Sequence, residues 1–175
     1  MDFNQIETKR LILRLVTEAD AQDFFELDSN PEVHRFLGNK PVKTIAESES
    51  MIAAILEQYK KFNLGRLAVI LKDTNEFIGW SGLKYEQNLR KEFKYYDLGY
   101  RFKQQYWGKS YATETAMASL CYGFKDLKLQ EINAAADIDH IASNTILKKI
   151  GMLPSGTFKY ENDLCNWYRI QNPYL

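Results

Sequence analysis

Residues 105–112 form a short polar segment of the kind that holds a phosphate group. The segment is Gln-Gln-Tyr-Trp-Gly-Lys-Ser-Tyr, and it lies between an apolar strand and a helix. Gly108 and Ser110 are small enough for a tight turn, and we expect Ser110 to cap the helix. Such a turn directs backbone N–H groups at one point, where the helix N-terminus adds about half a positive charge. The sequence therefore predicts a phosphate-bearing ligand, held mostly by backbone.

Two familiar phosphate-binding patterns do not match the segment. It lacks the three glycines of a dinucleotide fingerprint, and it does not complete the P-loop pattern. Taken alone, Gly108 could equally serve only to relieve a crowded turn. The surrounding elements have to decide between these two interpretations.

Hydrophobic periodicity places this segment late in an α/β (α+β) chain. We expect helices to begin at Thr17, Pro31, Thr44, Ser110 and Ala142, where Thr44 to Glu47 form a capping-box pattern. Strands are expected at 10–16, 66–72, 77–85, 95–102, 131–137, 153–160 and 165–170. Antiparallel hairpins therefore come first and a β-α-β-α-β order follows.

Length and composition narrow the class of protein. The 175 residues predict one domain, 1–175, and 23 basic residues balance 23 acidic ones. A nucleic-acid binder would carry a basic footprint, so that class is disfavoured. Cys121 and Cys165 are expected to be buried free thiols, and no metal site is predicted. Residues 1–5 lack the features of a signal peptide and no apolar run could span a bilayer, so we expect a cytoplasmic protein.

A series of different short motifs follows a defined order along nearly the whole chain. They are Thr8-Lys9-Arg10-Leu11-Ile12-Leu13-Arg14, Glu18-Ala19-Asp20-Ala21, Asn30-Pro31-Glu32-Val33, Phe77-Ile78-Gly79-Trp80-Ser81-Gly82-Leu83, Asp97-Leu98-Gly99-Tyr100, Tyr106-Trp107-Gly108-Lys109-Ser110-Tyr111-Ala112-Thr113-Glu114, Ala142-Ser143 and Lys149-Ile150-Gly151-Met152. This pattern resembles the GCN5-related N-acetyltransferase (GNAT) superfamily. Within it, the chain is similar to the branch that acetylates the N-termini of ribosomal proteins and related substrates.

The resemblance implies a mixed, mostly antiparallel sheet of six or seven strands, flanked by helices and splayed at its centre. It also implies acetyl-CoA as the cosubstrate, with no metal. The exposed edge of strand 95–102, at Tyr100, Arg101 and Phe102, would pair with the pantetheine. The N–H groups of 107–112 would hold the pyrophosphate. These residues are Trp107, Gly108, Lys109, Ser110, Tyr111 and Ala112, of which Lys109 either adds charge or is simply solvated.

Acetyl transfer to an amine needs a neutral amine, a polarised thioester and a protonated leaving thiolate. Asp97 is the base candidate, because a carboxylate within a strand is unusual and relatives often carry Glu here. The alternative is a structural carboxylate paired with Arg101 or a nearby lysine. Ser143 matches a hydroxyl that lies near the CoA sulfur in relatives, and it either serves the thiolate or caps a helix.

Two positions depart from the family pattern. Leu147 stands four residues before Gly151, where many members carry a tyrosine as general acid. His140 replaces an asparagine that contacts the pantetheine arm, and it either donates one hydrogen bond or is a surface histidine. Glu161, in an expected hairpin over the acceptor, either attracts a cationic amine or is an exposed acid.

We therefore expect an N-acetyltransferase that acts by direct attack of a primary amine within a ternary complex. The acceptor is a protein N-terminus or a small amine, and the resemblance leaves this open. It also leaves open a homodimer, while neither nucleic acid nor membrane is an expected partner. The competing hypothesis is a CoA-binding sensor or partner-binding domain that has lost turnover.

Overall fold

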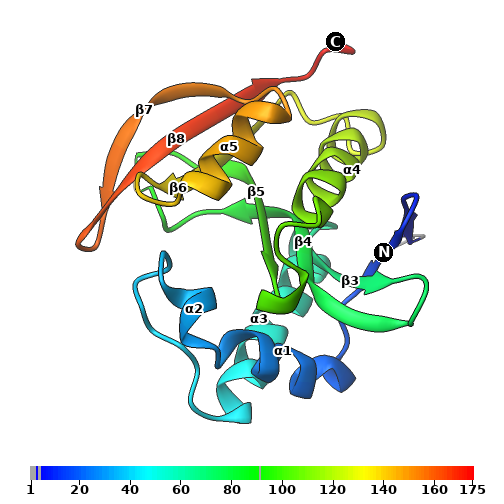
Figure 1. Cartoon of the computed structure of the whole chain (residues 1–175). Coiled ribbons are helices and arrows are strands. Elements are labelled where there is room, and N and C mark those ends of the chain that lie inside the picture. Colours follow the sequence, from blue (N-terminus) through cyan, green and yellow to red (C-terminus); the bar gives the residue numbers. More distant parts are fainter. Residues whose placement is uncertain (1–2, 4, 91) are drawn as a thin grey trace.

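The computed structural model describes residues 3, 5–90 and 92–175 (Figure 1). Three of the five residues that argue against a signal peptide, Met1, Asp2 and Asn4, lie outside the described residues. The strands are β1 (Ile6–Glu7), β2 (Leu11–Leu15), β3 (Arg66–Leu71), β4 (Glu76–Glu86), β5 (Tyr95–Phe102), β6 (Glu131–Asp137), β7 (Leu153–Tyr160) and β8 (Asp163–Gln171). The helices are α1 (Ala21–Asp28), α2 (Pro31–His34), α3 (Ile45–Phe62), α4 (Tyr111–Lys125) and α5 (Ile141–Lys149), with short 3-10 turns η1 (Glu18–Asp20) and η2 (Gln104–Tyr106).

In the described part of the chain, the strands form one eight-stranded sheet in the order β1-β2-β3-β4-β5-β6-β8-β7. Neighbouring strands are antiparallel except β5 and β6, which run parallel. The mixed, mostly antiparallel sheet is as predicted, but it has one strand more than expected. The additional strand is β1, whose two residues are too few to produce a periodic pattern.

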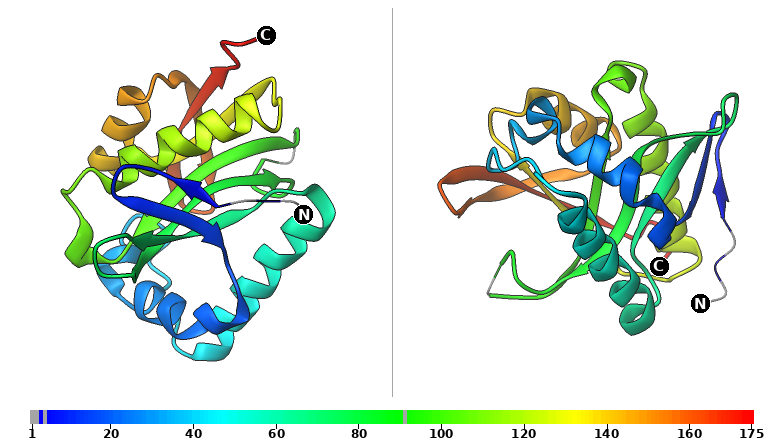
Figure 2. Two further views of the ribbon diagram at one scale, coloured as in Figure 1. Left: turned by 90° about the vertical axis from the view of Figure 1, so that its right-hand side faces the viewer. Right: turned by 90° about the horizontal axis from the view of Figure 1, so that it is seen from below.

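Helices cover both faces of the sheet, with α1 to α3 on one side and α4 and α5 on the other (Figure 2). One buried cluster joins α1 and α3 to Ala68 and Ile70 of β3. A second cluster joins α4 and α5 to the central strands, through residues such as Leu120, Leu147 and Tyr168. Burial of these apolar side chains holds the two layers of helices against the strands that lie between them.

Local capping explains where the long helix α3 begins. The backbone N–H of Thr44 donates to the carboxylate of Glu47 at 2.9 Å, which completes the predicted capping box. The helix ends where Asn63 adopts a left-handed conformation, with φ of 56°. Sequence signals that act within one turn therefore fix both ends of α3.

The prediction that both cysteines are buried was wrong. Cys121 and Cys165 are free thiols, but Cys121 is exposed and Cys165 is only partly buried. Helix α4 buries the face that carries Ala116, Leu120 and Phe124, and Cys121 lies off that face. Within residues 3, 5–90 and 92–175, no helix combines the length and the apolar character that crossing a bilayer requires.

Candidate active site

The sheet opens between β5 and β6. In the described residues the two strands pair at a single position, where Asp97 lies opposite Asn133. Beyond that position the strands diverge (Figure 1), while β5 keeps its full ladder with β4 on its other side. The backbone of 98–102 therefore presents an unpaired edge, to which an extended ligand could add as a strand does.

The segment that begins α4 lies beyond the end of this open edge. Gly108 has φ of 73° and Ser110 has φ of 63°, so both are left-handed. A Cβ added to Gly108 would meet no atom within 4 Å, which leaves space above the turn. Ser110 occupies the N-cap position but its side chain makes no capping hydrogen bond, so that prediction was wrong. The hydroxyl of an N-cap residue reaches the helix amides from extended backbone, which Ser110 does not have.

The first amides of α4 are the groups that this turn offers to a ligand. Hydrogen bonding within α4 begins with Glu114 N–H to the carbonyl of Ser110, so the amides of 111–113 precede it. The amide of Trp107 instead donates to Gln104 at 3.1 Å, and its indole donates to the carbonyl of Phe102 at 2.8 Å. Of the predicted amides, those from Gly108 onward remain for the pyrophosphate.

The electrostatics of this helix start suit an anion. Glu114 is the acid of the first turn, and it is paired with Arg10 at 2.7 Å. The guanidinium of Arg10 also lies 4.4 Å from the ring centroid of Tyr111. Lys109 is exposed, with its ammonium 5.3 Å from the ring of Tyr106. Arg10 thus cancels the charge of Glu114, and the helix dipole still favours a phosphate.

Tyr100 and Ser143 meet across the opening. The hydroxyl of Tyr100 lies 3.0 Å from Oγ of Ser143, and burial raises the pKa of Tyr100 to about 12. The phenol therefore keeps its proton at neutral pH. Ser143 belongs to the first turn of α5, but the N-cap of that helix is His140. The alternative that Ser143 caps the helix is therefore wrong.

Asp97 is buried on the opposite face of β5 from Tyr100, because the two residues are three positions apart and side chains alternate along a strand. Its Oδ2 accepts a hydrogen bond from Arg66 of β3, which is its ion-pair partner. The alternative pairing with Arg101 is wrong. Burial raises the pKa of Asp97, and Arg66 and Lys84 oppose that rise. A raised pKa brings a carboxylate closer to the range in which it can act as a base near neutrality.

Arg101 is turned toward α1 and α2. Its guanidinium pairs with Asp28, which is fully buried, and Asp28 also contacts His34 at 3.3 Å. Burial lowers the pKa of His34, so this imidazole tends to be neutral. The side chain of Arg101 is therefore committed to α1, and only its backbone remains for the pantetheine. Phe102 likewise buries its side chain in the core.

Several buried polar atoms on the Asp97 face have no hydrogen-bond partner in the described residues. They include Trp80 Nε1, Tyr95 Oη and Asn133 Oδ1. Tyr95 shares its face of β5 with Asp97, and Asn133 lies directly opposite Asp97. Buried polar groups are rarely left unpaired, so donors and acceptors are available for a ligand at the break in the sheet.

Two contacts tie the segment after α2 to the other side of the opening. The ring of Phe36 stacks on His140, with centroids 4.5 Å apart, and Lys40 pairs with Glu161 at 2.8 Å. Glu161 lies at the turn between β7 and β8, and both members of the pair are exposed. Residues 36–40, which we call the strap, therefore bridge from the α2 side to α5 and to the β7–β8 hairpin.

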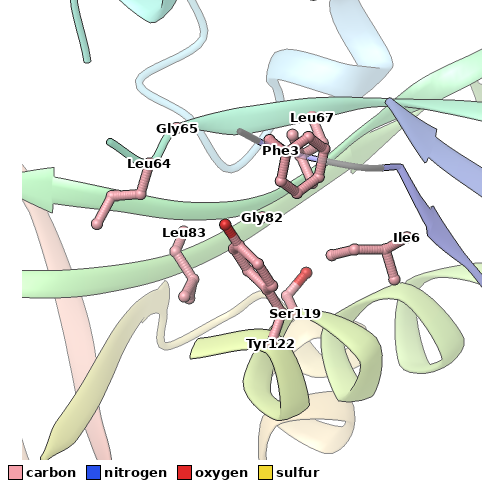
Figure 3. Close-up of a pocket in the computed structure, with 9 residues that line it drawn as sticks. All are labelled: Phe3, Ile6, Leu64, Gly65, Leu67, Gly82, Leu83, Ser119 and Tyr122. Atoms are coloured by element: carbon pink, nitrogen blue, oxygen red, sulfur yellow. The ribbon is translucent and has the colours of Figure 1, made fainter. Parts of the chain in front are cut away.

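A small cavity in the described residues lies away from the opening (Figure 3). It is lined by apolar residues of the N-terminal segment, β3, β4 and α4, including Phe3, Leu67 and Tyr122. Its volume of about 10 Å³ is no larger than one water needs. In the described residues no group of three or more His, Cys, Asp or Glu could hold a metal. The open sheet edge is therefore the better candidate for the active site.

A family model for the acetyltransferase (GNAT) domain matches residues 10–153. The chain belongs to the GNAT acetyltransferase family. It is 32% identical to the uncharacterized N-acetyltransferase YoaA of Bacillus subtilis over 177 residues, which cover 98% of each chain. As a member of this family the protein is an N-acetyltransferase, and proteins of this family use acetyl-CoA.

Solved structures share the GNAT fold over nearly the whole chain. An acetyltransferase of the family from Bacillus anthracis is 27% identical, with a TM-score of 0.79 and coverage of 97% of this chain and 99% of that one. A ribosomal L7/L12 alpha-N-protein acetyltransferase in complex with coenzyme A has a TM-score of 0.80 at 14% identity, with coverage of 96% and 98%. The likeness to the ribosomal-protein branch is thus confirmed at the level of fold.

Sequence reasoning missed two residues of this candidate site. Arg66 and Asp28 were not singled out, although they pair with Asp97 and Arg101. An arginine at the start of an otherwise apolar strand, Arg66–Leu71, was the available signal for Arg66. Asp28 gave no comparable signal, because acidic residues at the end of a helix are common on protein surfaces.

Proposed function

We propose that this GNAT enzyme transfers the acetyl group of acetyl-CoA to a primary amine, which attacks the thioester directly in a ternary complex. The observation that carries the proposal is the break in the sheet beside Asp97, flanked by the left-handed turn at Gly108. The unpaired edge of 98–102 would bind the pantetheine, and the amides from Gly108 to Ala112 would bind the pyrophosphate. The orphaned polar atoms at the break support a bound ligand there.

Groups on the two faces of β5 would serve the two partners of the reaction. Asp97 accepts the proton of the amine, directly or through a water molecule, on the side of α1 and α2. Ser143 donates to the departing thiolate on the side of α5, and Tyr100 donates to Ser143 in turn. Much of the rate gain would come from holding the amine and the thioester together.

Leu147 occupies the position at which many family members carry a tyrosine, and Tyr100 packs against the same cluster and supplies a phenol there. Leu147 is fully buried in the core and cannot donate a proton. The raised pKa of Tyr100 keeps its proton in place across the neutral range. The pair of Ser143 and Tyr100 would therefore serve as the hydrogen-bond donor to the thiolate, with Ser143 nearer to the sulfur.

The acceptor is a primary amine on a peptide N-terminus or on a small molecule. Three acidic side chains around the opening are paired, Asp97 with Arg66, Asp28 with Arg101 and Glu161 with Lys40. Each of these pairs removes a negative charge that a polycation could otherwise use. This favours an acceptor with a single amine, such as a peptide N-terminus or an amino-acid derivative.

A screen for acetylated products tests the proposal. The protein is incubated with acetyl-CoA and either peptides with varied N-termini or a panel of small amines. Products are detected by a mass increase of about 42 Da, which corresponds to an acetyl group replacing a hydrogen. Turnover of at least one amine is expected. Binding of acetyl-CoA without any product would instead support the sensor hypothesis.

A further inference from the structure

Arg66 is a buried arginine whose guanidinium reaches two neighbouring strands. Nη1 donates to the carbonyl of Gly82 on β4 and to the carbonyl of Asp97 on β5, the latter at 2.8 Å. Nη2 donates to Oδ2 of Asp97, and the side chain of Arg66 is 10% exposed. A guanidinium with this many fixed acceptors has little freedom to move.

The surroundings of Arg66 leave a space shaped for its guanidinium. A Cβ added to Gly99 would lie 2.6 Å from Nη2 and 2.8 Å from Cζ of Arg66. The guanidinium also lies 5.3 Å from the ring centroid of Trp80. Gly99 does not have a positive φ, so its backbone accepts any residue and the missing side chain is what matters. Gly99 is therefore needed for clearance.

The ion pair with Arg66 uses only one of the two carboxylate oxygens of Asp97. Oδ2 is held by Arg66, whereas the side chain as a whole keeps 13% of its surface exposed. Asp97 is also the residue at which β5 and β6 part. We propose that Arg66 is the positioning residue for Asp97: it keeps the carboxylate charged and fixes one oxygen, which leaves Oδ1 for the acceptor amine. This inference rests on the proposed function.

The other charges near Asp97 leave Arg66 as the deciding one. Lys84 and Glu86 of β4 act on Asp97 with opposite signs, and they pair with each other at 2.5 Å. Tyr95, two residues before Asp97, is neutral because burial raises its pKa. Burial raises the pKa of Asp97 and Arg66 opposes it, so moving the guanidinium away should raise that pKa further.

Gly99→Ala is the sharpest test, because it keeps both charged residues and only pushes the guanidinium away from Oδ2. We expect the acidic limb of the kcat/KM profile to move to higher pH, and kcat/KM at pH 7 to fall by about tenfold. Arg66→Lys keeps a positive charge but lacks the planar guanidinium with its several donors. It should give a smaller shift of the acidic limb in the same direction. In the Asp97→Asn background, the further substitution Arg66→Lys should not lower kcat/KM any more.

Arg14→Met provides the matched control, because Arg14 also pairs with a buried carboxylate, that of Asp20, away from the opening. It should lower Tm without moving the pH profile. The stabilisation by acetyl-CoA, measured as a Tm shift, reports whether each variant is folded. An unmoved acidic limb in both Gly99→Ala and Arg66→Lys, with that Tm shift intact, would overturn the inference.

A direct measurement separates this inference from the proposed function. The pKa of the Asp97 carboxyl group can be followed by carbon NMR in wild type, in Gly99→Ala and in Arg66→Lys, with no acceptor present. A higher pKa in the variants is expected, and equal values would reject the role of Arg66. A wild type that acetylates no amine in the screen would reject the proposed function alone.

Discussion

The hydroxyl of Tyr100 lies 3.0 Å from Oγ of Ser143, which joins β5 to the first turn of α5. The two residues stand 43 positions apart in the chain and meet where the sheet has opened. Asp97 lies on the other face of the same strand, paired with Arg66. One strand thus carries, on its two sides, the proposed proton acceptor Asp97 and the phenol that supports the proposed donor Ser143.

Ser143→Ala should lower kcat by about a hundredfold and change the binding of acetyl-CoA little, because a positioned proton donor contributes roughly that much. Tyr100→Phe keeps the ring in place and should cost about tenfold, since it acts through Ser143. Steady-state kinetics with both substrates varied would separate kcat from KM. A Tyr100→Phe enzyme with full kcat would show that the phenol only packs.

Gly108→Val should abolish the stabilisation of the protein by acetyl-CoA. A branched side chain would fill the space above the turn and would strain the left-handed backbone. Without ligand binding, the gain of about 2.7 kcal/mol expected at a hundredfold excess over Kd disappears. Thermal melts with and without acetyl-CoA measure this directly.

Gly156→Val is the control for that experiment. Gly156 of β7 also has a positive φ, 108°, and open space around its Cβ position. It should lower Tm of the free protein in a similar way but keep the shift caused by acetyl-CoA. If Gly108→Val also kept that shift, the turn would not be the phosphate site.

Asp97→Asn should remove the acidic limb of the kcat/KM profile. In wild type, activity falls as pH drops through the pKa of Asp97, because the protonated carboxyl group cannot accept a proton. Burial raises that pKa, so the limb should lie above the usual value near 4 for aspartate. Identical profiles for wild type and Asp97→Asn would rule out Asp97 as the base. Ser143→Ala, by comparison, should keep the limb.

Lys40→Glu should raise the KM for the acceptor several-fold and leave Tm almost unchanged. The pair of Lys40 and Glu161 is exposed, so it adds little to stability, but it fixes the strap against the β7–β8 hairpin. Two carboxylates at that point would repel each other. The double variant Lys40→Glu with Glu161→Lys should restore the KM, and high salt should reduce the difference between the variants. If the double variant kept the raised KM, the pair of Lys40 and Glu161 would not be what holds the strap.

Much of the fold could be predicted because its signals are local. The bounds of β5 and β6 are those expected from apolar runs between turn residues. The start of α3 follows from Thr44 and Glu47, which lie within one helical turn. The turn at Gly108 follows from small residues just before an amphipathic helix. The strand β1 was not predicted, because two residues are too few to show a hydrophobic periodicity.

The partners of the candidate site residues could not be predicted in the same way. Asp97 pairs with Arg66 rather than with Arg101, which lies on the same face of β5 but four residues further along the extended strand and pairs with Asp28. The strand register places Arg66 opposite Gly82, and Gly82 opposite Gly99, which brings the guanidinium to Asp97. Ser110 was expected to cap α4, but its backbone conformation depends on the whole turn.

The sequence by itself determined the family, the order of the elements and the turn before α4, since each is carried by short motifs whose own residues lie close together in the chain. Only the tertiary structure decided which side chains meet at the opening. Tyr100 reaches Ser143, and Arg66 reaches Asp97 across 31 positions. Such contacts follow from strand register and helix packing, which are set by the burial of the whole core.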